Sequence, residues 1–167
     1  MMDEKTDKRM LAKSPDGDLQ AGLTILADVY QNRLPFNKVL GLRVDRLDVE
    51  RVCLRFDMQA ILVGNYVFGV LHGGVISTAL DAAGGLAATA GILPRLMGCP
   101  RAEIEAAIAR IGTIDLRIDY LRPGTGRRFY ATGAAMRTGR KVSVIRMEMH
   151  NEKGRLIAVG TGTYIVG

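Results

Sequence analysis

The chain has 167 residues, of which 48% are hydrophobic and 24% charged, and its formal net charge is +6. This composition is that of an ordinary globular protein, and the length predicts one domain with enough residues to bury a core. No apolar run approaches the roughly 20 residues of a membrane-spanning helix, and the start does not resemble a signal peptide, so membrane insertion is not expected. Cys53 and Cys99 lack metal-ligand spacing, which favours free thiols in a reducing cytoplasm.

The first part of the chain predicts a tail, a helix and two strands. Residues 1–18 are polar and of mixed charge, so we expect a poorly ordered tail before a single domain at residues 19–167. Residues 19–34 carry apolar side chains at helical spacing, and Pro35 is expected to end this helix. Two strands are then predicted near Leu42–Leu47 and Arg51–Asp57.

The central segment places one carboxylate, Asp81, in an apolar helix that begins at the Gly73-Gly74 pair. Between Val75 and Ala90 the apolar side chains point in nearly every direction, which is typical of a buried helix. An ionised carboxylate there is costly unless it is paired or hydrogen-bonded, and chemistry is the readiest explanation for such a cost. The alternative is a structural aspartate that is satisfied by Ser77 or by a neighbouring strand.

The second half predicts a short helix at residues 102–110 and then four strands joined by short turns. The four strands are expected at Thr113–Leu121, Arg128–Arg137, Lys141–His150 and Arg155–Val166. In the first of these the alternation places four apolar side chains on one face: Ile114, Leu116, Ile118 and Tyr120. Strands on both sides of one buried helix predict an α+β fold in which an antiparallel sheet curls around one long central helix.

Positive charge is concentrated between Arg110 and Arg146. This window has nine basic and two acidic residues, and therefore a net charge of +7. Such a concentration attracts nucleic acid, a membrane surface or a phosphorylated small molecule, although solvated strand edges also use Lys and Arg. Only three aromatic residues fall in the window, which is too few for the stacking platforms of a nucleic-acid site.

The spacing of Gly73 and Asp81 indicates how an active site could form. The two residues lie eight positions apart, which corresponds to about 12 Å along a helix axis. A carbonyl held by the Gly73 amide is out of reach of the same chain's Asp81, because reacting groups must approach to about 3 Å. In two antiparallel copies of the helix, Gly73 of one chain would face Asp81 of the other. If Asp81 is catalytic, the spacing therefore predicts a homodimeric site.

Three motifs carry a resemblance to a known family. Asn65 precedes His72-Gly73-Gly74, Asp81 stands nine positions after His72, and residues 112–123 read GTIDLRIDYLRP. This pattern resembles the hotdog-fold acyl-CoA thioesterases of the PaaI type, and residues 34–167 look closest to the YigI branch. The resemblance implies the hotdog fold and hydrolysis of acyl-CoA, with medium- to long-chain substrates expected. It also implies homodimers that often pair into tetramers, with no metal and no cofactor, since coenzyme A is part of the substrate.

The resemblance also implies roles for individual residues. Asp81 matches the catalytic carboxylate, which acts as base or nucleophile, and Gly73 matches the glycine whose amide polarises the thioester carbonyl. Asn65 resembles a residue that orients the carbonyl or the water. Thr113 falls where relatives place a hydroxyl that assists the water. His72 belongs to the same group, with a structural or positioning role.

Substrate binding is expected to involve residues with small, basic or apolar side chains. Gly74 lets a ligand approach the backbone closely. Arg140 and Lys141, in a strand turn, are the first candidates for the phosphates of coenzyme A, and Arg122 comes next. Two members of the apolar segment 61–71 are expected to line the acyl pocket or, alternatively, to pack in the core: Val67 and Phe68.

This sequence departs from the family pattern at two places, and two alternative functions remain open. Asn65 stands seven positions before His72 where relatives have six, and residues 92–110 look like an insertion that reshapes the acyl pocket or the oligomer interface. The alternatives are a hotdog hydratase or dehydratase, whose catalytic histidine motif is not found here, and a non-catalytic acyl-CoA sensor. Asp81 favours the enzyme, because such sensors tend to lose the carboxylate.

Overall fold

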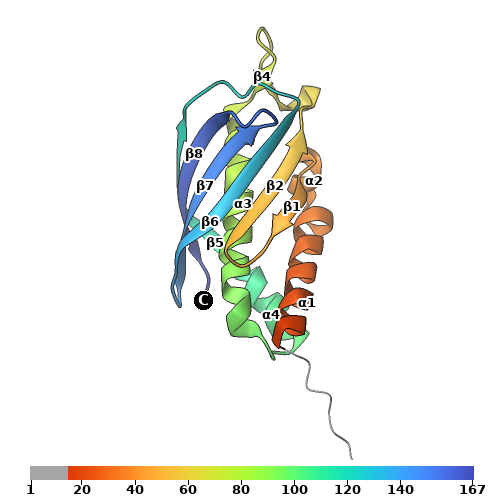
Figure 1. Cartoon of the computed structure of the whole chain (residues 1–167), viewed down its shortest axis with the longest axis vertical. Helices are drawn as coiled ribbons and strands as arrows, with labels where there is room; N and C mark the ends of the chain where they lie inside the picture. The colour runs from red at the N-terminus through yellow and green to blue at the C-terminus, as the bar shows by residue number, and fades with distance from the viewer. Residues whose placement is uncertain (1–14) are drawn as a thin grey trace, which may run out of the picture.

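A six-stranded antiparallel sheet wraps around one long helix, α3 (Gly73–Ile92), in the computed structural model of the chain, which describes residues 15–167 (Figure 1). The strand order is β1-β2-β6-β7-β8-β5, so β1 and β5 form the two edges. The strands are β1 (Arg43–Leu47), β2 (Arg51–Asp57), β5 (Gly112–Tyr120), β6 (Arg128–Thr138), β7 (Val142–Asn151) and β8 (Leu156–Ile165). Each bound lies within one residue of the predicted one, and the predicted sheet around a central helix is confirmed.

Helix α3 is buried against the sheet, and small residues on both the helix and the sheet let the two approach closely. A Cβ atom at Gly133 of β6 would lie only 2.6 Å from the carbonyl oxygen of Ala83 on α3. Contrary to the prediction, residues 73–96 are long and apolar enough to cross a membrane by length and composition, but 61% of their most apolar window is buried in this fold. That burial is what a core helix requires, so the small and apolar residues of α3 are explained by its packing against the sheet.

The Gly84→Ala substitution tests this close packing. A Cβ atom at Gly84 would overlap the hydroxyl of Tyr164 and crowd Met147, so we expect a loss of about 1–3 kcal/mol in the free energy of unfolding. Gly22→Ala in a peripheral helix is the matched control, because its new methyl group would meet Leu93 at an ordinary 3.4 Å and should stabilise by up to about 1 kcal/mol. Urea unfolding of the two variants measures both effects. Equal stabilities would contradict the packing described.

The segments before the sheet are helical over a longer range than predicted. They are α1 (Pro15–Asp28), the π-helical turn η1 (Val29–Arg33) and α2 (Pro35–Leu40). Helix α1 starts four residues before the predicted Leu19, so residues 15–18 of the predicted tail are helical, whereas residues 1–14 lie outside the described residues. Pro35 begins α2 instead of only ending the first helix, because proline is well tolerated at the first helical position.

A projecting hairpin precedes α3, at the top of Figure 1. It consists of the 3₁₀ turn η2 (Ala60–Leu62), β3 (Val63–Asn65) and β4 (Val70–Leu71). The side chains at its tip are exposed, with Val67 at 67% and Phe68 at 75%. In the apolar segment 61–71, only Leu62 and Leu71 are buried. The segment as a whole therefore does not pack in the core of the protomer.

The predicted insertion at residues 92–110 forms a 3₁₀ turn and a helix. They are η3 (Leu93–Leu96) and α4 (Arg101–Ala109). Residues of α4 and η3 share cavities with residues of α1, and in Figure 1 α4 is drawn between the lower parts of α3 and α1. The insertion thus adds a layer of helices beside α3.

Strand β5 departs from the predicted alternation near its start. A bulge lies between Thr113 and Asp115 in its pairing with β8, and such a bulge re-aims the neighbouring side chains. Leu116 and Ile118 pack against the core as predicted, whereas Ile114 is 58% exposed. On its outer side β5 has no strand partner among residues 15–167.

Candidate functional site

The first turn of α3 leaves one backbone amide free. His72 is the N-cap residue, and its Nδ1 accepts a hydrogen bond of 2.9 Å from the Gly74 amide. The amides of Val75 and Ile76 both donate to the carbonyl oxygen of His72. The Gly73 amide has no hydrogen-bond partner in the described part of the chain. Because unpaired amides at a helix start carry partial positive charge, Gly73 offers a donor to the oxygen of a bound carbonyl.

A surface pocket of about 360 Å³ adjoins this free amide. It is lined by Gly73 and by nearby residues that include Tyr120 and Arg122. The Tyr120 hydroxyl donates to the Gly73 carbonyl oxygen at 3.1 Å, and an Arg122 nitrogen donates to the Leu156 carbonyl oxygen at 3.0 Å. The structure therefore brings three predicted residues, His72, Gly73 and Arg122, to one end of the sheet.

The Asp81 carboxylate is held by two strands. Its Oδ1 accepts a hydrogen bond of 2.9 Å from the Thr113 hydroxyl on β5 and one of 3.2 Å from the Tyr164 hydroxyl on β8. Asp81 is half-buried, and its Oδ2 accepts no hydrogen bond from the described residues. One oxygen is thus fixed, while the other can take a proton or attack a carbon atom.

Tyr164 is a member of this group that sequence reasoning missed. Burial first, and then the charge of Asp81, raise the pKa of Tyr164 well above its ordinary value. The phenol therefore stays neutral and donates a hydrogen bond to the carboxylate. Tyr164 stands in a strand that reads as ordinary core, so only the register of β8 against α3 shows its contact with Asp81.

Of the two structural partners suggested for Asp81, Ser77 and a neighbouring strand, only the strand binds it. Ser77 donates to the Gly74 carbonyl oxygen at 3.0 Å and does not satisfy Asp81. A neighbouring strand does, as that alternative allowed, through Thr113. These hydrogen bonds offset the burial of Asp81 and still leave Oδ2 available, so they are compatible with a chemical role.

Strand β5 contacts both ends of the candidate site. It carries Thr113, which binds Asp81, and Tyr120, which binds the Gly73 carbonyl oxygen. Both target residues lie on the uninterrupted helix α3, eight positions apart, so about 12 Å of helix axis separates them. Within one protomer the free amide and the carboxylate cannot meet across one carbonyl group.

Three of the predicted residues, Asn65, Val67 and Phe68, lie at or next to the tip of the hairpin before α3. The Asn65 Oδ1 accepts hydrogen bonds from the amides of Val67 and Phe68, at 3.0 and 3.3 Å. Asn65 therefore closes its own turn, as asparagine often does. All three residues are exposed, so their side chains are open to solvent in this chain.

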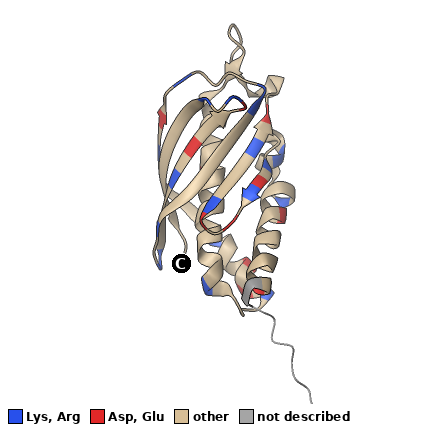
Figure 2. Cartoon of the chain, in the orientation of Figure 1, with Lys and Arg blue, Asp and Glu red and all other residues tan. Residues whose placement is uncertain are grey.

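The basic window is divided between the two ends of the sheet. Arg122 lies in the segment that leads into β6, whereas Arg140 and Lys141 lie in the turn that follows the other end of β6. Arg95, just beyond α3, donates to two carbonyl oxygens of this turn, which places the turn beside the C-terminal end of α3. Figure 2 shows the basic residues scattered over the sheet and its ends instead of forming one surface.

Three comparisons place these features among known proteins. The family model described as Thioesterase superfamily matches residues 68–158. The chain is 43% identical over 148 residues to the Escherichia coli (strain K12) protein named medium/long-chain acyl-CoA thioesterase YigI, with 89% of this chain and 96% of that protein covered.

Solved structures agree with this result. A protein of Shewanella oneidensis described as related to the thioesterase superfamily has a TM-score of 0.85 and 44% identity, over 89% of this chain and 97% of that one. A mutant of the phenylacetic acid degradation protein PaaI from Thermus thermophilus has a TM-score of 0.60 and 27% identity, over 79% and 98%. The predicted resemblance and the predicted fold are both confirmed.

Proposed function

Since this chain belongs to the thioesterase superfamily, we propose that it hydrolyses medium- to long-chain acyl-CoA to a free acid and coenzyme A. The observation that carries the proposal is that α3 presents two groups suited to this reaction, the free Gly73 amide and the hydrogen-bonded Asp81 carboxylate. The similarity to YigI, which is named for medium- and long-chain acyl-CoA, supports the choice of substrate. Release of free thiol from acyl-CoA substrates of increasing chain length tests it directly.

The active site is shared between two chains in this proposal. Two α3 helices that lie antiparallel across a two-fold axis bring Gly73 of one chain to Asp81 of the other, which removes the 12 Å separation within a protomer. The unpaired outer edge of β5 supports such a dimer, since exposed strand edges readily pair with another chain. Exposed apolar side chains at Ile114 and Leu121 add to that surface. Dimers of this kind would then pair into tetramers.

The chemistry follows from the two groups. The Gly73 amide donates a hydrogen bond to the thioester oxygen and stabilises the negative charge that develops there. Asp81 then acts as base or as nucleophile. As a base, its free Oδ2 takes a proton from water while the water oxygen bonds to the carbonyl carbon. The bond between that carbon and sulfur then breaks, and the thiolate of coenzyme A takes the proton from Asp81.

Labelled water separates the two roles of Asp81. In a single turnover in water carrying a heavy oxygen isotope, the base route places the label in the released acid. In the nucleophile route Asp81 attacks the carbonyl carbon, the carbon–sulfur bond breaks and the thiolate leaves, which gives an anhydride with Asp81. Attack of water on the Asp81 side of that anhydride leaves the label in the enzyme, so label in the enzyme identifies this route. Mass spectrometry of the acid and of the peptide containing Asp81 reads out both sites.

Arg140 and Lys141 are proposed to hold the phosphates of coenzyme A. Both are exposed, and neither has an ion-pair partner among the described residues, whereas Arg128 pairs with Asp57 at 2.6 Å. Free cations at the mouth of a site attract a phosphorylated ligand without taking part in the reaction.

The double variant Arg140→Ala/Lys141→Ala is expected to raise KM and to leave kcat nearly unchanged, because the contacts form equally in the ground and transition states. Each exposed ion pair is worth up to about 1 kcal/mol, so KM should rise roughly tenfold. Higher salt should weaken the wild type more than the variant. A short thioester without the nucleotide is the control, and both proteins should hydrolyse it equally. A lower kcat on that short substrate would place the two residues in the catalytic machinery.

A further inference from the structure

A second cavity lies beside α3, on the side that α1 and α4 cover. It has a volume of about 470 Å³ and lies between α1, η1, α3 and α4. Most of its wall is apolar: Ile25, Val29, Leu34, Ile108, Ala109 and Ile111. The two charged residues that line it, Arg33 and Glu105, are exposed and form ion pairs elsewhere, with Asp28 and Arg101. The cavity therefore offers no free charge to a polar ligand.

The polar groups in the wall of this cavity are already satisfied. The Thr89 hydroxyl donates to the Gly85 carbonyl oxygen at 2.7 Å, and an interaction with Thr89 lowers the pKa of Tyr30 against the larger effect of burial. A cavity without unpaired polar groups does not hold water well and favours an apolar occupant. An alkyl chain is such an occupant.

The cavity continues the face of α3 that carries Asp81. Asp81, Gly85 and Thr89 are spaced four residues apart and so share one face of the helix. Gly85 has no side chain to block this face, and a Cβ atom there would lie 3.0 Å from the Tyr30 hydroxyl. Tyr30 lines the cavity, and its pKa is raised first by burial and also by the nearby charge of Asp81. Tyr30 therefore marks the side of the cavity that is near Gly85 and the Asp81 carboxylate.

We propose that this cavity holds the far end of the acyl chain, an inference that rests on the acyl-CoA hydrolysis proposed above. Thr89 lies eight residues, or about 12 Å of helix axis, beyond Asp81. An extended chain advances about 1.2 Å per bond, as a peptide does over its three bonds per residue, so about ten bonds span this length. A butyryl group ends well short of the cavity, a decanoyl group, with nine carbon–carbon bonds, ends at its edge, and a palmitoyl group extends into it.

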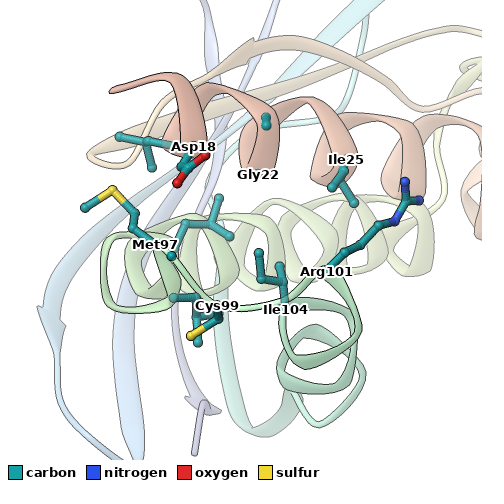
Figure 3. A pocket seen from close by; sticks show the side chains of 12 residues that line it. Asp18, Gly22, Ile25, Met97, Cys99, Arg101 and Ile104 are labelled. Atoms are coloured by element: carbon teal, nitrogen blue, oxygen red, sulfur yellow. The ribbon is translucent and has the colours of Figure 1, made fainter. Parts of the chain in front are cut away.

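Ile25 forms the end wall for the longest chains. It lines this cavity and also a neighbouring one of about 350 Å³ between α1, η3 and α4. Figure 3 shows the neighbouring cavity, with Ile25 of α1 on one side and Ile104 of α4 on the other. Removing the Ile25 side chain would join the two spaces. The helix α4, part of the predicted insertion, thus becomes a determinant of acyl chain length.

The test compares kcat/KM for butyryl-, decanoyl- and palmitoyl-CoA in three variants. Ala109→Trp fills the cavity from α4 and should lower kcat/KM for palmitoyl-CoA at least about tenfold, the effect of leaving two methylene groups in water, with a smaller effect on decanoyl-CoA. Its activity on butyryl-CoA should be unchanged. Ile25→Ala should raise the ratio of palmitoyl to decanoyl hydrolysis. Ala106→Trp, on the same helix but outside the cavity lining, is the matched control and should behave as wild type.

The outcomes separate this inference from the proposed function. If Ala109→Trp and Ile25→Ala both keep the wild-type ratios among the three substrates, the acyl chain lies elsewhere and the inference is wrong, although wild-type hydrolysis would still support the proposed function. If the wild type hydrolyses none of the three, the proposed function is wrong and the inference is wrong with it. Should Ala109→Trp fail to fold, the ratio measured with Ile25→Ala decides alone.

Discussion

Asp81→Asn is expected to lower kcat for acyl-CoA hydrolysis by about 10²–10⁴-fold, the usual contribution of a positioned acid or base. An asparagine keeps the side-chain oxygen that accepts hydrogen bonds from Thr113 and Tyr164. Its amide nitrogen would replace the free Oδ2, and an amide can neither take the proton of water nor attack the thioester. The substitution thus removes the reactive atom and keeps the hydrogen bonds that hold the side chain.

The measurement pairs steady-state kinetics with thermal unfolding. Asp45→Asn is the matched control, because Asp45 is an exposed residue of β1 that pairs with Arg55, at the sheet edge opposite β5. That variant should keep wild-type kcat. Near-normal turnover by folded Asp81→Asn would show that the carboxylate is structural, as the hydrogen bonds from the neighbouring strands alone would allow.

Mixing two inactive variants is expected to restore activity. Gly73→Pro removes the free amide, and loss of one such donor costs about 10²–10³-fold in kcat. The backbone tolerates the change, since Gly73 is the first residue of α3 and its amide makes no hydrogen bond among the described residues. His72 has φ −64° and ψ 137°, the extended conformation that a residue before proline prefers.

A heterodimer of Gly73→Pro and Asp81→Asn chains contains one site with both mutations and one site with neither. Random exchange of equal amounts should therefore give roughly a quarter of wild-type activity, because half of the dimers are mixed and half of their sites are intact. Differently tagged chains allow the mixed dimers to be isolated and assayed. Gly73→Ala is the control, since it keeps the amide and its methyl group would meet Tyr120 at an ordinary 3.6 Å. Isolated mixed dimers without activity would rule out the shared site.

The sheet could be predicted from the sequence because residues 113–121 alternate clearly and the other strands are bounded by short turns of Gly, Asn or charged residues. Helix α3 was predictable for a related reason, since a run of apolar and small residues is stable only in a core. The departures are local. Ile114 is exposed because a bulge shifts the pairing of β5, and the register of one edge strand is not encoded in its own alternation.

From local patterns alone, the candidate site was predictable only where its residues are neighbours in sequence, and Thr113, which contacts Asp81 from β5, was predicted only through the family resemblance. His72, Gly73 and Asp81 belong to one helix, so their spacing was sufficient to place them. Tyr164 and Tyr120 reach the same helix from strands far along the chain, and no local pattern distinguishes them from core tyrosines. The cavity beside Thr89 is formed by three helical segments and a turn, and its shape depends on how they pack together.

One rigid helix that carries both reactive groups also determines how the two sites of the proposed dimer can move. The distance between Gly73 and Asp81 within a chain is fixed by the hydrogen bonds of α3. If two such antiparallel helices slide past each other, the offset between amide and carboxylate changes by the same amount at both sites. One site cannot tighten while the other loosens through this motion. Sliding can therefore only align or misalign the amide and the carboxylate at both sites at the same time.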